Sequence, residues 1–333
     1  MTHRLARFAL VAALAAALPI AFATPARAVW FWGTKPLGMG TASTGLADDN
    51  NAIQVNPAGI GQQDGRYSVD VNYERREYEI RDYPQLHQDD DRFKEDQEDD
   101  FGSEVFFQDE EETPVDEKNQ SDFWHASIVD GATVPGSAFG LSFTAVNFPN
   151  RTFGEGEDFR GSVAFAGGEP SLLLIGGAAK YIQIDQDTRN FNADFGALLK
   201  LFDGYVGIGL VGRNVFGSPD EYRIAREVAL GIAVKTLEDR LEVAFDSTKV
   251  FDVEEDNTFN FAAGLQGLIY KQYGSPGGLA LRTGYLWDQI YERQNWSAGV
   301  AWVAPEGLLG YSFQGDIERS RNFIHSFHIT FRF

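Results

Sequence analysis

The stretch "PLGMGTASTGLADDNNAIQVNPAGI" (residues 36–60) differs from the rest of the chain, because it is rich in Gly and Ala and has no regular period. After Gly65 the sequence instead alternates apolar and polar residues with a period of two, as β-strands do. Small residues permit close approach between backbones. We therefore expect this stretch to lie not on a surface but inside a barrel formed by the strands.

The first 28 residues have the features of a secretory signal peptide. Arg4 and Arg7 make a positive start, and an apolar run follows over residues 8–23. The run is short and contains Pro19, which argues against the alternative of a membrane anchor. We expect cleavage after Ala28.

The composition narrows the class of protein. The chain has no Cys, which excludes disulfides, thiolate metal sites and acylation of a cysteine. No apolar run of about 18 residues follows the leader, so no helical span is expected there. Export, many aromatic residues and no spanning helix together favour an outer-membrane barrel, with a secreted β-sandwich as the alternative.

The negative charge is concentrated in one place. Residues 82–122 hold seventeen acidic side chains against three basic ones. Such a block repels itself and is typical of a solvated loop, and its sign argues against nucleic-acid binding. The acidic loop (residues 82–121) lacks the spaced ligands and glycine of an EF-hand, but weak binding of divalent cations that bridge lipopolysaccharide phosphates stays open.

The alternation continues to the end of the chain. Tyr67, Val69 and Val71 face one way while Ser68 and Asp70 face the other, which suits a barrel with a polar interior. Fourteen strands are predicted, over residues 66–81, 122–134, 137–148, 158–167, 171–184, 189–202, 204–214, 222–236, 239–250, 257–270, 277–289, 294–304, 307–317 and 322–333.

An even number of strands puts both ends of the barrel on the periplasmic side and the acidic loop outside. The sheet must close, because unpaired amides in hydrocarbon cost several kcal/mol each. Fourteen strands enclose more space than side chains fill, and residues 29–65 are the candidate to fill it. The prediction is thus an all-β, 14-stranded antiparallel transmembrane barrel over residues 66–333, with an N-terminal hatch in its lumen. Outward Trp and Tyr residues are expected to form girdles at the lipid headgroups: Trp124, Trp287, Trp296, Trp302, Tyr291 and Tyr311.

Residues 37–60 resemble the N-terminal hatch of the FadL-like long-chain fatty-acid and hydrocarbon transporters, and of the PorV-like proteins that share their fold. The resemblance is dense over about 25 residues, while the rest of the chain matches in architecture, including a terminal aromatic residue, Phe333, as in barrels recognised by the outer-membrane assembly machinery. The residues that carry it are Gly38, Gly40, Asp48, Asp49, Asn56, Pro57 and Ala58.

The resemblance implies a passive transporter for hydrophobic molecules in the outer membrane of a Gram-negative bacterium. An apolar ligand would be captured outside, pass over the hatch and leave sideways through the barrel wall. Trp30, Phe31 and Trp32 are the candidates to touch it, with packing inside the hatch as the alternative. The family's outer loops are usually apolar, whereas the long loop here is acidic and would repel a carboxylate. The alternative function is a PorV-like structural or secretion-associated barrel that binds partner proteins at the cell surface.

Other chemistries have weaker support. His125 and Ser127 share one face of a strand, so a catalytic dyad is geometrically conceivable, but no acidic residue is placed to orient the histidine. His325 and His328 point to opposite faces, which argues against a metal pair. We expect no enzyme activity, no cofactor and no metal site.

Overall fold

The computed structural model describes residues 31–79, 118–147, 157–184, 188–217, 224–236, 239–251, 259–271, 277–289, 293–317 and 322–333. The expected signal peptide, Trp30, Tyr291 and residues 80–117 of the acidic loop lie outside the described residues.

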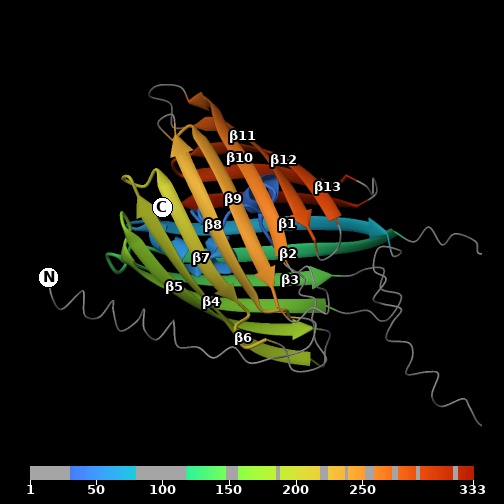
Figure 1. The fold of residues 1–333 in the computed structure, drawn as a ribbon. Coiled ribbons are helices and arrows are strands. Elements are labelled where there is room, and N and C mark those ends of the chain that lie inside the picture. The colour runs from blue at the N-terminus through green and yellow to red at the C-terminus, as the bar shows by residue number, and fades with distance from the viewer. Residues whose placement is uncertain are drawn as a thin grey trace, which may run out of the picture.

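Fourteen antiparallel strands form one closed barrel, in which each strand pairs with its neighbours in sequence and β1 pairs with β14 (Figure 1). The predicted fold class is therefore confirmed for the barrel. The strands are β1 (Tyr67–Glu79), β2 (Lys118–Asp130), β3 (Ser137–Asn147), β4 (Glu157–Glu169), β5 (Leu173–Ile184), β6 (Thr188–Leu201), β7 (Val206–Arg213), β8 (Glu227–Thr236), β9 (Leu241–Val250), β10 (Phe259–Lys271), β11 (Gly278–Asp288), β12 (Arg293–Ala304), β13 (Gly307–Asp316) and β14 (Phe323–Arg332).

The largest boundary errors concern β2 and β8. β2 begins at Lys118, four residues before the prediction, because it pairs with β1 up to the Glu79–Lys118 position. It ends at Asp130, whose Oδ1 accepts the amides of Ala132 and Thr133 and so turns the chain. β8 begins five residues later than predicted, since residues 224–226 are described but are not strand.

The two faces of the strands have opposite chemistry. In β1 the side chains of Ser68, Asp70 and Asn72 are buried, while Tyr67 and Val71 are exposed. Phe331 on the last strand and Phe333 directly after it are likewise exposed. The wall is therefore polar inside and apolar outside, as in a barrel that stands in lipid. Trp124, Trp287, Trp296 and Trp302 all face outward, as expected of girdle residues.

Residues 31–66 form the N-terminal segment, which contains α2 (Thr34–Gly38), α3 (Ala52–Val55) and the 3₁₀ helix η1 (Pro57–Gln63). α2 packs against β11 to β14, whereas η1 packs against β2 to β6. The segment therefore reaches both sides of the ring of strands, and Figure 1 shows its short blue helices among them. Among the described residues, no helix has the length and apolar character needed to cross a bilayer.

Candidate functional site

The inner wall holds three pairs of glycines that face each other across neighbouring strands. An inward glycine in a strand interior weakens the strand and marks a place where another backbone comes close. Each pair here lies directly against the N-terminal segment, and a Cβ at any of the six positions would overlap with other atoms. The pairs are Gly176–Gly196 on β5 and β6, Gly209–Gly231 on β7 and β8, and Gly264–Gly284 on β10 and β11.

The Gly264–Gly284 pair receives Met39 and Gly40. A Cβ on Gly264 would lie 2.5 Å from the Met39 carbonyl oxygen. Gly40 itself has φ 65°, where other residues are strained, and its amide donates to Ser297 Oγ at 2.9 Å. Gly38 ends α2 and has no positive φ, but its missing Cβ makes room for Ser312 Oγ.

The Gly176–Gly196 pair receives the Asn56-Pro57-Ala58 turn. Asn56 is extended before Pro57, with φ −156° and ψ 101°, and its Oδ1 accepts the Ala58 amide at 3.2 Å. Asn56 Nδ2 donates to the carbonyls of Thr44 at 3.1 Å and Ala197 at 3.2 Å, so one buried side chain joins two parts of the segment to β6. This turn is therefore held by hydrogen bonds between the Asn56 side chain and main-chain groups.

The Gly209–Gly231 pair receives Thr44 and Gly45. Beside it, the buried Asp246 of β9 accepts the amides of Ser43 and Thr44 on the same oxygen, each at 2.8 Å. A carboxylate that accepts two backbone amides makes strong, charge-assisted hydrogen bonds. The middle of the segment is thus tied to β9.

Four charged side chains join the segment to β8 and β9 in a cycle that we call the ion-pair ring: Lys35, Asp48, Lys235 and Glu242. Lys35 Nζ lies 2.7 Å from Asp48 Oδ1 and 3.0 Å from Glu242 Oε2, and Lys235 Nζ lies 3.2 Å from each carboxylate. Burial alone would raise the pKa of Asp48, but Lys35 and Lys235 lower it well below its usual value. A lowered carboxyl pKa stabilises the fold above the unfolded pKa, so the ring persists down to mildly acidic pH.

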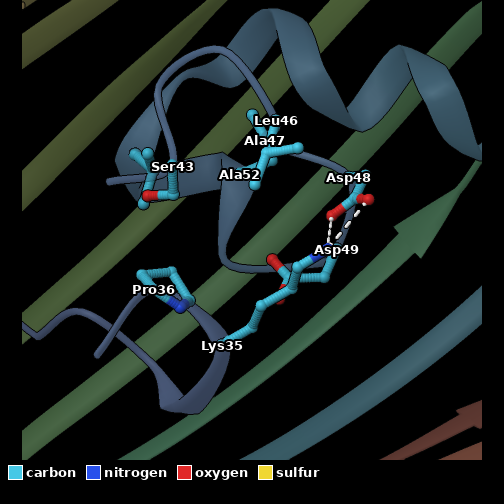
Figure 2. A pocket seen from close by; sticks show the side chains of 9 residues that line it. Lys35, Pro36, Ser43, Leu46, Ala47, Asp48, Asp49 and Ala52 are labelled. Carbon is cyan, nitrogen blue, oxygen red and sulfur yellow. Dashed lines mark hydrogen bonds and ion pairs between the residues drawn. The ribbon is translucent and has the colours of Figure 1, made fainter. Parts of the chain in front are cut away.

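A small pocket adjoins the ion-pair ring (Figure 2). Its walls include Lys35, Ser43, Asp48 and Asp49, and its cavity volume is about 10 Å³, which is room for about one water molecule. The Asp49 carboxylate accepts hydrogen bonds from Asn51, whose backbone amide and side-chain amide both donate to it. The pocket is smaller than the 300–1,000 Å³ typical of small-molecule sites and its walls are partly charged, so it does not suit an apolar ligand.

Replacement of Asp48 by Asn should loosen the N-terminal segment, because Lys35 and Lys235 lose their shared anion. For a partly buried network we expect a loss of about 1–3 kcal/mol of stability. Leu37 and Leu46 are buried, so chymotrypsin cleavage after these two leucines in the folded, detergent-solubilised protein should become faster. Asp239→Asn, at an exposed turn, is the matched control and should leave cleavage unchanged. Equal cleavage of the two variants would show that the ring does not hold the segment.

Phe31 and Trp32 occupy the start of the described segment. Phe31 is buried and stacks on His125 with ring centroids 4.5 Å apart, and it packs with Phe123 and Val146. Trp32 is half-buried and lies 6.0 Å from the Arg213 guanidinium. The two candidate ligand residues are thus divided between β2 and β7 and do not form one aromatic pocket.

His125 and Ser127 lie on the same inner face but are not hydrogen-bonded to each other. His125 Nδ1 is 2.8 Å from Thr144 Oγ1, while Ser127 Oγ has no partner among the described residues. No cluster of three His, Asp or Glu side chains suited to a metal occurs in the described part of the chain. The two faces of β14 separate His325 from His328, as expected.

Several residues that seat the segment were missed in the sequence. The partners of the motif residues were not predicted: Asp48 binds Lys235 of β8, and Asn56 binds the backbone of β6. The glycines inside the predicted strands were the signal that could have located the seat, because strand glycines mark close approach. Asp246 and Glu242 resemble any other inward polar residue in an alternating pattern, so nothing in the sequence singled them out.

No protein-family model and no curated protein sequence matches the chain. Solved structures do match it. The Ralstonia pickettii toluene transporter TbuX has a TM-score of 0.57 at 11% identity, over 90% of this chain and 97% of that one. The monoaromatic hydrocarbon channel CymD has a TM-score of 0.58 at 12% identity, over 90% and 98%. A FadL homologue from Pseudomonas aeruginosa has a TM-score of 0.53 at 12% identity, over 94% and 99%.

These likenesses show the fold: the chain folds as a FadL-like outer-membrane barrel, as the resemblance of residues 37–60 predicted. A closed 14-stranded barrel with an apolar outer face is a protein of the Gram-negative outer membrane. Identities of 11–12% leave function to be argued from the residues themselves.

Proposed function

We propose that this barrel is a passive outer-membrane transporter for hydrophobic small molecules, and that residues 29–65 are the hatch in its lumen. The observation that carries the proposal is the seat: three facing glycine pairs on the wall meet Met39-Gly40, Thr44-Gly45 and Asn56-Pro57-Ala58. Six inward glycines cost strand stability, so the wall is adapted to hold this segment closely. The motif residues Gly40, Asn56, Pro57 and Ala58 are all at that seat.

The hydrophobic substrate class rests on weaker support. TbuX, CymD and the FadL homologue are named as a toluene transporter, a monoaromatic hydrocarbon channel and a FadL protein, and they share this fold. Phe31 of the segment is buried against β2, whereas Trp32 is half-buried beside Arg213 of β7, where a ligand in the lumen would meet it. The acidic loop expected outside would repel a carboxylate, so the substrate class that we favour is neutral.

A sideways exit through the wall has its best support at the β6–β7 seam. The ladder there pairs only Phe195–Leu201 of β6 with Val206–Gly212 of β7, although β6 itself begins at Thr188. Among the described residues this ladder has fewer residue pairs than the β5–β6 and β7–β8 ladders beside it, and beyond it the Val215 amide donates to the Ala193 carbonyl at 3.0 Å. A ligand that leaves there would enter lipid rather than the aqueous periplasm.

Two measurements test this function. Native mass spectrometry of the protein, purified from its own membrane, should show a co-purifying hydrophobic molecule. Intact cells that produce the protein should take up dilute labelled toluene or decane faster than cells that lack it. Equal uptake rates, together with no bound small molecule, would reject transport.

The alternative is a PorV-like barrel that holds partner proteins at the surface. One observation favours it: the pocket beside the hatch is small and partly charged, as in a lumen that is filled for stability alone. In that case the same mass spectra should show a stable protein companion instead of a hydrophobic ligand. The companion would remain after mild detergent exchange.

A further inference from the structure

Three serines stand side by side on the inner wall of β2, β3 and β4. Ser127 is directly opposite Ser142, and Ser142 is directly opposite Ser162. Directly paired residues on one face of a sheet have Cβ atoms about 4.5–5.5 Å apart, so the three hydroxyls form a line. We call Ser127, Ser142 and Ser162 the serine row.

The serine row is buried and its hydroxyls have no hydrogen-bond partner among the described residues. The three residues are 2%, 7% and 4% exposed, and each Oγ is unpaired. A buried polar group without a partner costs about 1–3 kcal/mol. Three neighbouring hydroxyls without partners are therefore unfavourable for stability, and a ligand that bound them would remove this cost.

His125 adds a donor beside the row. It lies two residues from Ser127 on the same face of β2 and is 2% exposed. Arg160 donates to Gln54 Oε1 at 3.3 Å, which orients the Gln54 amide so that its nitrogen, 3.2 Å away, donates to His125 Nδ1. Thr144 Oγ1 lies 2.8 Å from the same nitrogen, and its hydroxyl can donate to it as the Gln54 amide does. With Nδ1 as the acceptor, the ring proton of a neutral imidazole sits on Nε2, which has no partner in the described structure.

Packing does not require these polar groups. On the wall across the barrel, six of the buried inward positions hold alanine, which fills space without unmet hydrogen bonds. Those positions are Ala229, Ala233, Ala244, Ala262, Ala280 and Ala301. Below the serine row, Ala164 and Ala178 pack against Ile53 and Ile60 of the segment, so the row begins where that apolar contact ends. If the three serines only filled space in the lumen, alanine would serve equally well at these positions.

Phe31 covers this region from the N-terminal end of the segment. Its ring stacks on His125 at 18° between planes and packs against Phe123. Phe31 belongs to a short stretch before α2, and its removal would uncover His125 Nε2 and an aromatic wall together. The combination offers hydrogen bonds along the row, whose paired neighbours at its two ends are the buried Asp70 and Lys180, and an apolar surface at Phe123.

We propose that the serine row and His125 Nε2 bind the oxygen of a neutral, oxygen-bearing hydrophobic molecule, such as a long-chain alcohol or ketone, when Phe31 moves aside. The inference rests on the proposed transport of hydrophobic molecules and names their polar group. The hydroxyls donate to or accept from an alcohol oxygen, and Nε2–H donates to it. A site built for hydrogen bonds discriminates against analogues that lack the oxygen.

The test compares 1-decanol, decane and decanoate by titration calorimetry in detergent, with empty micelles as the blank. The intact protein should bind 1-decanol roughly tenfold more tightly than decane. A Ser127→Ala, Ser142→Ala and Ser162→Ala triple variant should lose that preference and keep its affinity for decane. Its thermal stability should not fall, because the lost hydroxyls were unpaired. The control triple, Ser137→Ala, Ser171→Ala and Ser247→Ala, changes serines outside this site and should behave as the parent.

The outcomes separate the two proposals. If none of the three compounds binds, both this site and hydrophobic transport are rejected. If decane and 1-decanol bind equally to the parent and to the triple variant, transport stands and the site is overturned. Tighter binding of decanoate than of 1-decanol would overturn the proposal that the ligand is neutral.

Phe31→Ala provides a second variant that keeps the serine row intact. It should bind 1-decanol faster in stopped-flow tryptophan fluorescence. An unchanged rate would show that Phe31 does not cover the site.

Discussion

Deletion of residues 29–60 should turn the barrel into an open, water-filled pore. The closed ring of fourteen strands is complete without this segment, so the wall can still form. A barrel of this size has a lumen wider than its inward side chains fill, and single-channel conductance in planar bilayers should rise at least about tenfold. The side chains that line the lumen are polar, as a wet pore requires.

The Trp32→Ala protein is the control for this deletion. It trims one half-buried side chain and leaves the seat at the glycine pairs intact, so its conductance should stay close to that of the full chain. Heat-dependent mobility on a denaturing gel verifies that each barrel is folded. If the deletion variant is folded and conducts no better than the full chain, residues 29–60 do not close the bore.

Valine at Gly209 or Gly284 should displace the N-terminal segment without removing it. A side chain at Gly209 would overlap with the Thr44 carbonyl, and one at Gly284 with the Met39–Gly40 peptide. Overpacking typically costs about 1–3 kcal/mol, and a clash with backbone belongs at the upper end because backbone cannot rotate away. We expect chymotrypsin to cut these folded variants rapidly after Leu37 and Leu46, and conductance to rise towards that of the deletion.

Gly267→Val is the matched substitution for this experiment. Gly267 lies on β10, as Gly264 does, but no atom lies within 4 Å of the position that its Cβ would take. Valine there should leave both cleavage and conductance unchanged. If Gly267→Val and Gly284→Val give the same result, a general weakening of the strands would explain it. The proposal that the glycine pairs hold the segment would then be wrong.

The agreement between predicted and observed strands shows which structural features a local sequence pattern can predict. Alternation along β1 and β14 placed Asp70 and Thr330 inside and Val71 and Phe331 outside, which the structure confirms. That pattern is local, because lipid on one side and a polar bore on the other act on each residue separately. The ends of β2 and β8 were wrong because a strand ends where its pairing ends, and pairing depends on the neighbouring strand.

By itself the sequence determined the barrel, the number of strands and the face of the wall on which each side chain lies. It could do so because the alternation of apolar and polar residues lies within each strand. It also marked residues 36–60 as the part that needs close contact. Only the tertiary structure decided that Asp48 meets Lys235, that Thr44 meets Asp246, and that Gly284 makes room for Gly40. These partners are roughly 200 residues apart, and closure of the barrel brings them together, so no local pattern could identify them.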